Sequence, residues 1–269
     1  MFSRRGFRTF AAFATKTPLN QSELSEEEKV FLEKQERRTV FKQLYNDALK
    51  QGDYRQLYMF GQSTVVNSNP DKLDGECLWM TARANRLYAY NHTDKETDKL
   101  RLITEGFELS KKAIEKDDNN WAAHKWYAIM LGDFTEISGS QHQLKASSKI
   151  REHMEKAAEL NPEDATTFYS LGLWHYSFAS MSWLTRNVAR TIFPELPETD
   201  YGTALEYFER AEEMDPGFYS MNWLYLAKCY QVLGHEEMFK VYRKKLVKMK
   251  PIDDDDRNAV KEARRMKFD

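Results

Sequence analysis

Large apolar residues and small residues recur along this chain in blocks of one spacing. The clearest block surrounds a small residue with large apolar ones and ends at a proline: Trp223, Leu226, Ala227, Tyr230, Gly234 and Pro251. Apolar residues three and four positions apart share one face of an α-helix, and a proline cannot continue a helix. The block therefore predicts two antiparallel helices, a first helix A and a second helix B, which end at the proline.

The two halves of the same block recur upstream, as Phe168, Leu171, Gly172 and His175, and as Tyr201, Ala204, Phe208, Ala211 and Pro216. This spacing closely follows the tetratricopeptide repeat of 34 residues, where a small residue on helix A lets helix B cross closely. The sequence predicts an all-α fold, a tetratricopeptide-like solenoid of antiparallel helix pairs with a C-terminal capping helix. A plain helical bundle is disfavoured, because Pro162, Pro216 and Pro251 agree in frame.

We predict five repeat units and a last helix that covers the open apolar end: 38–71, 74–118, 121–162, 165–216 and 220–251, then 254–267. Residues 21–37 are expected to form an acidic lead-in helix before a repeat domain of residues 38–269. Two units are longer than the repeat. One contains an insert near 178–198, and in the other the stretch around Gly132–Ser148 predicts an enlarged loop between helices A and B. Insertions in repeat proteins often lie on the binding face.

The helix A positions that usually line the concave groove of this repeat supply candidate binding residues, which are Lys125, Trp126, Ile129, Asp133, Tyr169, Ser170, Leu173, Tyr176, Leu224, Tyr225, Lys228 and Gln231. The groove is aromatic and apolar, and such a surface is unusual without an occupant. A partner helix, a lipid tail or the insert around Trp183–Leu196 would each fit it. Occupation by the chain itself, or simple core packing, is the interpretation that we favour.

A second candidate surface is basic. Six bases fall within eleven residues that contain no acid: Lys240, Arg243, Lys244, Lys245, Lys248 and Lys250. A basic helix face of this kind is suited to an acidic, disordered partner, held by an attraction that salt weakens. The alternative is a solvated face balanced by the four aspartates at 253–256, and for this surface taken alone we slightly favour that alternative.

The first twenty residues differ from the rest. They carry Arg4, Arg5, Arg8 and Lys16 and no acid, and on a helical wheel these bases separate from four phenylalanines. Such a segment is typical of a mitochondrial presequence or of a helix on an anionic membrane surface; a disordered tail is the alternative. The remaining residues hold 36 bases and 42 acids, so the folded body is mildly acidic and does not suit a general nucleic-acid binder.

Motifs for chemistry are missing from the sequence. There is no Gly-rich phosphate loop, HExxH, G-x-S-x-G or CxxC motif, so we expect no catalytic residue, no metal site and no cofactor. His175 occupies an aromatic position of the repeat and is expected to be packed, while His124, His142 and His153 have no evident partner. Cys77 and Cys229 lie in separate units, which favours a reduced, intracellular chain.

Residues 123–234 resemble the regulator of microtubule dynamics family. The resemblance rests on AHKWYAI at Ala123–Ile129, REHMEKAAELNPEDATTFYSLGLWHYSFA at Arg151–Ala179, the W-L-x-R-x-V-A-R insert at Trp183–Arg190, and the Y-x-x-A-L-E-Y-F-E-R-A segment that begins Tyr201–Asn222. It implies a tetratricopeptide-like protein without known catalysis that associates with microtubules and spindle poles, some members being found at mitochondria or acting as organelle tethers. With no membrane-spanning anchor in its sequence, the chain resembles the shorter members.

Two functional hypotheses follow from these observations. In the first, the chain is a non-catalytic interaction protein of the cytoplasm and cytoskeleton, whose basic helix engages the acidic tails of tubulin and which affects microtubule dynamics or spindle organisation. In the second, it is a mitochondrial or membrane-contact protein whose apolar groove binds a lipid or a partner helix. The two conflict if residues 1–20 direct import into mitochondria, because microtubules are cytosolic.

Overall fold

The computed structural model describes residues 25–68, 73–192 and 198–268. Within these ranges the chain forms twelve α-helices and no β-strand: α2 Glu26–Gln51, α3 Arg55–Asn67, α4 Gly75–His92, α5 Glu96–Lys116, α6 Trp121–Ser138, α7 Ser140–Leu160, α8 Ala165–Ala179, α9 Trp183–Ile192, α10 Tyr201–Met214, α11 Ser220–Val232, α12 Glu236–Lys248 and α13 Asp254–Arg265. Residues 1–20, expected to target the chain or to lie on a membrane, fall outside the described residues. None of the described helices is long and apolar enough to cross a membrane.

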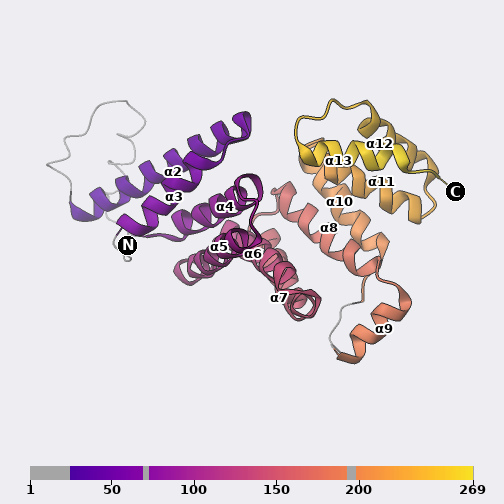
Figure 1. The fold of residues 1–269 in the computed structure, drawn as a ribbon, viewed down its shortest axis with the longest axis horizontal. Coiled ribbons are helices and arrows are strands. Elements are labelled where there is room, and N and C mark those ends of the chain that lie inside the picture. The colour runs from indigo at the N-terminus through magenta and orange to yellow at the C-terminus, as the bar shows by residue number, and fades with distance from the viewer. Residues whose placement is uncertain (1–24, 69–72, 193–197, 269) are drawn as a thin grey trace, which may run out of the picture.

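The helices stack as sequential pairs (Figure 1). α4 packs on α5, α6 on α7, α8 on α10, and α11 on α12, while α13 covers α11 and α12 at the C-terminal end. The predicted all-α solenoid with a capping helix is thus confirmed. We call α2–α7 the N-terminal half and α8–α13 the C-terminal half.

Small residues set the spacing within the pairs. Gly172 of α8 lies under the ring of Phe208 in α10, and a Cβ built at Gly172 would come within 2.7 Å of that ring. The small residue therefore lets α8 and α10 approach closely. Equivalent small residues are fully buried in α4, α6 and α11, where they are Ala82, Ala128 and Ala227. Each of these four helices, α4, α6, α8 and α11, starts seven residues before its small residue, so the four share one register.

The N-caps of successive A helices hold the stack together. Asp74, Asn120 and Asp164 each accept a hydrogen bond from a backbone N–H in the first turn of α4, α6 and α8, which satisfies an otherwise unpaired donor. Each cap also contacts a side chain of the preceding A helix; the pairs are Arg38–Asp74 at 2.7 Å, Glu76–Asn120 at 2.6 Å and Lys125–Asp164 at 3.0 Å. Capping and stacking thus use the same residues.

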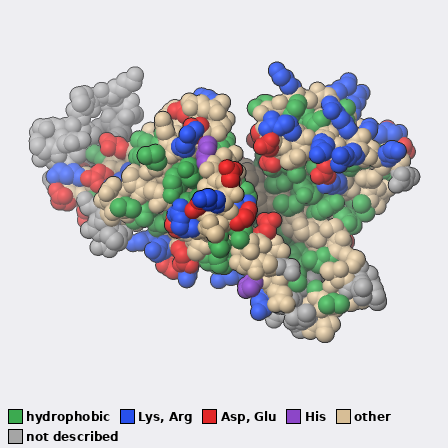
Figure 2. Space-filling view, in the orientation of Figure 1, with side chains coloured by type: hydrophobic (Ala, Val, Ile, Leu, Met, Phe, Trp, Pro, Cys, Tyr) green, Lys and Arg blue, Asp and Glu red, His purple; other side chains and the backbone are tan. Residues whose placement is uncertain are grey.

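The two halves have separate apolar cores. One extends through α2–α6 and the other through α8, α10, α11 and α12, with a small cluster of Ala128, Met154 and Leu171 between them. Figure 2 shows a hollow between the N-terminal half and the part formed by α11–α13, with hydrophobic side chains on its C-terminal wall. Burial, Tyr45 and Asp253 together raise the pKa of Tyr54, so the turn before α3 lies within electrostatic reach of the turn before α13.

Two expectations about segment boundaries meet a different structure. The enlarged loop around Gly132–Ser148 is wrong: α6 runs to Ser138 and α7 begins at Ser140. The extra residues lengthen both helices, and Gly139 alone makes the turn with φ of 102°, a backbone conformation that glycine adopts at little cost. The division placed between residues 37 and 38 falls inside the continuous helix α2, which starts at a capping box formed by Ser25.

The insert lies away from the groove in its described part. Ala189 of α9 is buried against Trp174 and Phe178 on the far side of α8, and Arg186 donates a hydrogen bond to the Phe178 carbonyl oxygen at 2.9 Å. Figure 1 places α9 beside the end of α8 and away from α11 and α13. Occupation of the groove by α9 is therefore wrong; residues 193–197 are outside the described residues.

Candidate interaction surfaces

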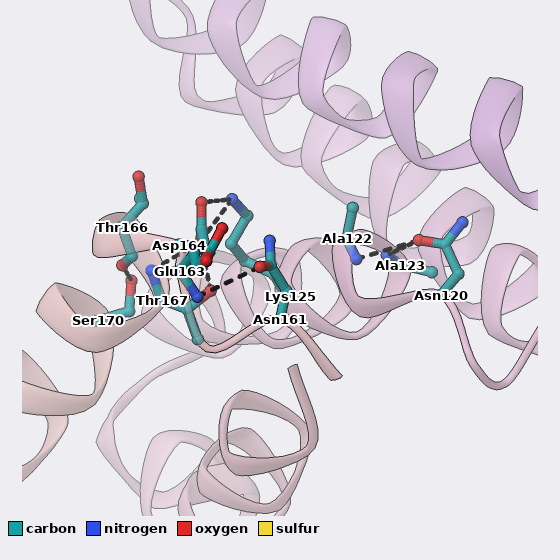
Figure 3. A network of polar contacts seen from close by, with 10 residues as sticks. All are labelled: Asn120, Ala122, Ala123, Lys125, Asn161, Glu163, Asp164, Thr166, Thr167 and Ser170. Atoms are coloured by element: carbon teal, nitrogen blue, oxygen red, sulfur yellow. Dashed lines mark hydrogen bonds and ion pairs between the residues drawn. The ribbon is translucent and has the colours of Figure 1, made fainter. Parts of the chain in front are cut away.

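The N-terminal wall of the groove contains an ion pair between the two halves. Lys125 of α6 is 7% exposed, and its Nζ lies 3.2 and 3.0 Å from the two carboxylate oxygens of Asp164 at the start of α8 (Figure 3). Burial outweighs the attraction of Asp164 and lowers the pKa of Lys125, with a further contribution from the charge of Arg83. The candidate groove residue Lys125 thus fastens one half to the other.

The other candidates of α6 face the same wall. Asp133 accepts hydrogen bonds from Arg86 of α4 at 2.6 Å and from the hydroxyl of Tyr90 at 3.1 Å. Trp126 is half-buried on the N-terminal core, and Ile129 is half-buried between the cores. These residues form one continuous surface over α4 and α6.

Arg83 of α4 is the residue of this wall that sequence reasoning missed. It follows Ala82 directly, so it occupies in α4 the position held in α6, α8 and α11 by Ile129, Leu173 and Lys228. Its guanidinium carbon lies 3.7 Å from the ring centre of Tyr45, 5.2 Å from Trp79 and 5.9 Å from Trp126. Carrying the repeat register back to Ala82 in the loosely matching unit 74–118 would have found it.

Arg83 has no counter-ion in the part of the chain that the structure describes. It makes no ion pair or hydrogen bond there, and its Nε is shielded from solvent without an acceptor. The residue as a whole remains half-buried, and burial lowers its pKa. We call Arg83 with the rings of Tyr45, Trp79 and Trp126 the Arg83 box.

The C-terminal wall is filled by aromatic packing. Tyr176 lies edge-on to Tyr225 at 4.9 Å between ring centres, and Tyr225 stacks on Phe208 at 5.4 Å. Tyr169 contacts the same cluster, 6.4 Å from Tyr225, and Leu173 is half-buried against it. Candidates from two repeat units therefore meet here, and they largely pack against one another.

Three further candidates are held by the cap. Leu224 is 0% exposed beneath α12 and α13, so it offers no surface to a partner. Lys228 pairs with Glu262 of α13 at 2.7 Å, and Gln231 donates to the carbonyl oxygen of Lys267 at 2.6 Å. Ser170 hydrogen-bonds within its own helix (Figure 3). The predicted groove residues thus divide between a wall over α4 and α6 that contains ion pairs and a wall over α8 and α11 that is packed with aromatic rings.

The six bases of the basic surface have different roles. Arg243 donates to the carbonyl oxygens of Ala263 and Met266 at 3.0 Å each and so caps the end of α13. Lys245 pairs with Glu212 at 3.3 Å, and Lys240 pairs with two glutamates of its own helix. Among the residues that the structure describes, Lys244, Lys248 and Lys250 have no ion pair, and all three are exposed.

The four aspartates that follow these lysines make local contacts. Asp253 caps α13, and Asp256 accepts from the backbone N–H of Ile252. Asp254 pairs with Arg257, and Asp255 accepts from the hydroxyl of Tyr219 at 2.5 Å. Their carboxylates are thus engaged at the start of α13.

The capping helix adds bases that were not singled out from the sequence. A shallow depression of about 350 Å³ on α13 is lined by Pro251, Arg257, Val260, Lys261, Arg264 and Arg265. Residues 236–268 contain eleven bases and seven acids, and Lys and Arg side chains gather over α12 and α13 in the view of Figure 2. We call this surface of α12 and α13 the basic cap. In the sequence, the K-E-A-R-R-M-K run that follows the four aspartates could have indicated the bases of α13.

The histidines and cysteines do not form a reactive centre in the described ranges. His124 and His153 lie with their Nδ1 atoms 2.8 Å apart, a contact between α6 and α7 that their spacing did not reveal. His175 stacks on Tyr207 at 5.0 Å and is packed, as expected. Both cysteines are free and buried. No group of three or more His, Cys, Asp or Glu side chains within these ranges is arranged to hold a metal ion.

Comparisons with known proteins agree with this architecture. The model of the family described as "Regulator of microtubule dynamics protein 1-3" matches residues 41–267. Regulator of microtubule dynamics protein 1 of mouse is 40% identical over 196 residues, which cover 71% of this chain and 64% of the relative. The human protein of that name is 42% identical over 160 residues, covering 60% of this chain and 51% of the relative. The chain thus spans only part of these relatives.

Among solved structures, a thermophilic tetratricopeptide-repeat protein of Thermus thermophilus superimposes with a TM-score of 0.56. It covers 86% of this chain and 99% of its own, at 16% identity, and so supports the fold alone. The family model, in contrast, covers most of the chain and agrees with the residues that carry the resemblance. The chain therefore belongs to the regulator of microtubule dynamics family.

Proposed function

We propose that this chain is a non-catalytic interaction protein of the cytoplasm and cytoskeleton, which binds microtubules through its basic cap and thereby affects their dynamics. The observation that carries the proposal is the unbalanced charge of residues 236–268, eleven bases against seven acids, in a chain whose overall net charge is −2. Membership of the family supports the choice of partner. The acidic tails of tubulin are the part of that partner that a basic surface would attract.

The arrangement of charges favours the basic cap over the rest of the chain. Lys244, Lys248 and Lys250 are exposed and without ion pairs, and α13 adds Lys261, Arg264 and Arg265 beside them. The cap is held rigidly, because Arg243 ties α12 to the end of α13. A rigid basic surface loses little conformational entropy when it meets a disordered acidic segment.

Co-pelleting with polymerised tubulin tests this proposal. We expect the full chain to pellet at low salt and to be released as ionic strength rises toward ~0.5 M, because salt screens the attraction between exposed charges. The double substitution Lys244→Glu, Lys248→Glu, which reverses two charges of the basic cap, should weaken pelleting by about tenfold or more. The double substitution Lys111→Glu, Lys112→Glu, at two exposed positions of α5, changes the net charge equally and is the matched control.

Two results would overturn the proposal. One is the absence of pelleting at low salt. The other is an equal loss of pelleting in both double variants, because that would show attraction by net charge and no role for the basic cap. A spindle role and the site of action need a cellular test; we expect a tagged full chain, and one lacking residues 1–20, both to mark microtubules. Mitochondrial localisation that depends on residues 1–20 would favour the second candidate below.

The second candidate is a mitochondrial or membrane-contact protein with a lipid or partner helix in the groove. It is favoured by the position of α9, which packs on α7 and α8 on the far side from the groove. The aromatic packing of Tyr169, Tyr176 and Tyr225 against one another counts against it on the C-terminal wall. Mass spectrometry of the purified chain decides whether a lipid is retained, and a stoichiometric lipid would support this candidate.

A further inference from the structure

Arg83 stands in an environment that a cation does not ordinarily occupy alone. Its Nε is buried without an acceptor, and three aromatic rings surround the guanidinium at 3.7–5.9 Å. Removing a charge from water costs free energy unless a partner offsets the loss. The attraction between a cation and an aromatic ring offsets only part of that cost. The fold thus holds Arg83 in place without completing its contacts.

The neighbouring cations show what Arg83 lacks. Arg86, one turn further along α4, has Asp133 at 2.6 Å, and Lys125 on α6 has Asp164 at 3.0 Å. Arg86 and Lys125 thus each have a carboxylate beside them, and Arg83 has none among the described residues. The charge of Arg83 also acts on Lys125, whose pKa it helps to lower.

The geometry leaves the guanidinium able to take a carboxylate. The guanidinium carbon lies 3.7 Å from the ring centre of Tyr45, and of the guanidinium nitrogens only Nε is shielded from solvent without a partner, so the two Nη atoms are the N–H groups that an outside acceptor could reach. Carboxylates bind such groups through two parallel charge-assisted hydrogen bonds. A carboxylate there would give Arg83 the kind of partner that Arg86 and Lys125 already have.

We propose that the Arg83 box receives the side-chain carboxylate of one aspartate or glutamate from a partner protein that docks in extended form along α4 and α6. The residues flanking that acid are apolar, because the half-buried side chains of Trp126 and Ile129 lie on this wall. The inference does not rest on the proposed function, because the Arg83 box belongs to α4 and the basic cap to α12 and α13.

The test uses the full chain and two matched peptide libraries. One library holds nine-residue, fluorescein-labelled peptides with a central Glu between Leu, Ile, Val or Phe residues, and the other has Gln in place of that Glu. Fluorescence polarisation should find binders in the Glu library that weaken roughly 10- to 100-fold as Gln peptides, as expected for loss of a charge-assisted pair. The same binders should weaken to a similar extent on Arg83→Met.

Two further variants separate binding from folding. Arg83→Lys keeps the charge but loses the two-pronged edge, so binding should be intermediate. Arg101→Met removes an exposed arginine of α5 that pairs with Glu105 at 2.8 Å, and it should leave binding unchanged. The melting temperature should stay level or rise in Arg83→Met, because methionine fills the apolar box without a buried charge; a purely structural Arg83 would instead lower it.

Four results would overturn the inference. They are a Glu library without binders, binders that tolerate Gln equally, binding that survives Arg83→Met, and a fall in melting temperature on Arg83→Met without loss of peptide binding. Vesicles of phosphatidylserine and phosphatidylcholine provide a last arm. Vesicle binding that depends on Arg83, in place of peptide binding, would assign the Arg83 box to a membrane surface and reject the protein partner.

Discussion

Two cations, one in each half of the molecule, lie over aromatic rings, but only one of them has an acid as a partner. In the C-terminal half Lys245 lies 5.0 Å from the ring centre of Trp223, and Glu212 offsets its charge at 3.3 Å. In the N-terminal half Arg83 lies 3.7 Å from the ring centre of Tyr45, and no acid of the described residues pairs with it. Aromatic surroundings alone therefore do not assign a role to a cation. The fixed carboxylate makes Lys245 part of the fold, and its lack leaves Arg83 open to a carboxylate from outside.

A histidine pair of the N-terminal half and a tyrosine of the C-terminal half show a similar contrast. In the N-terminal half His153 faces His124 at 2.8 Å, so two groups that gain positive charge oppose each other. In the C-terminal half Tyr230 faces an acceptor, Glu209, to which it donates a hydrogen bond. Tyr230 thus has its acceptor inside the fold, whereas the histidine pair of the N-terminal half becomes unfavourable when positive charge is added.

The largest effect is expected from removing the acid of the C-terminal half. Glu212 is 8% exposed and accepts from the Trp223 indole at 2.7 Å as well as from Lys245. Glu212→Ala should lower the free energy of unfolding by about 3 kcal/mol, because it leaves a buried donor and a cation unpaired. Urea denaturation measures it. Exposed Glu213→Ala is the control, and a loss below about 0.5 kcal/mol for Glu212→Ala would break the comparison.

A somewhat smaller effect is expected at the junction of the halves. Lys125→Met should cost about 2 kcal/mol, because Asp164 then loses its partner across α6 and α8 while it keeps its hydrogen bonds to Thr167. Urea denaturation with two probes would show whether the halves still unfold together. Lys111→Met, at an exposed position of α5, should have no measurable effect. A stability of Lys125→Met equal to that of the native chain would show that apolar contacts alone join the halves.

The pH dependence should report on the histidine pair. Burial, followed by the charge of His124, lowers the pKa of His153 to about 4. The unfolded histidine, with a pKa near 6.5, binds protons more readily, so stability is lost as the pH falls from about 6.5 to about 4. We expect a loss of about 1–2 kcal/mol for this half-buried ring after allowance for solvent screening.

Burial lowers the pKa of His175 to about 4 as well, so the native chain should lose stability at both sites over this range of pH. His153→Gln should flatten the dependence in part, and exposed His142→Gln should not. Thermal unfolding between pH 7 and pH 4 measures the slopes. Equal slopes in the native chain and in His153→Gln would show that the contact between the two rings has no role in this dependence.

The smallest effect is expected at Lys240. It has two glutamates of its own helix at 2.9 and 3.2 Å, but its side chain is 55% exposed. Exposed ion pairs contribute little after side-chain entropy and salt screening, so Lys240→Ala should leave the free energy of unfolding unchanged within experimental error. A clear loss, measured by urea denaturation, would show that this face of α12 is more strongly coupled to the fold than its exposure indicates.

Prediction from the sequence succeeded where the signal was local. The boundaries of the A helices followed from small residues such as Gly172 and Ala227 and from prolines such as Pro216, since periodicity and chain breaks act over a few residues. It failed at Gly132–Ser148, because Gly and Ser signals there predicted a loop that one glycine provides. It also passed over Arg83, because the unit containing it matches the repeat loosely and no register was carried onto it.

The sequence by itself determined an all-α stack of helix pairs and the shared register of their A helices, because these depend on spacing within single helices. Only the tertiary structure decided which charges are completed. Lys125 and Asp164 stand 39 residues apart and the two contacting histidines 29 apart, and their contacts depend on how successive pairs stack. That stacking brings Glu212 to Lys245 and, among the described residues, no acid to Arg83. The spacing of residues within one helix could not have predicted this difference.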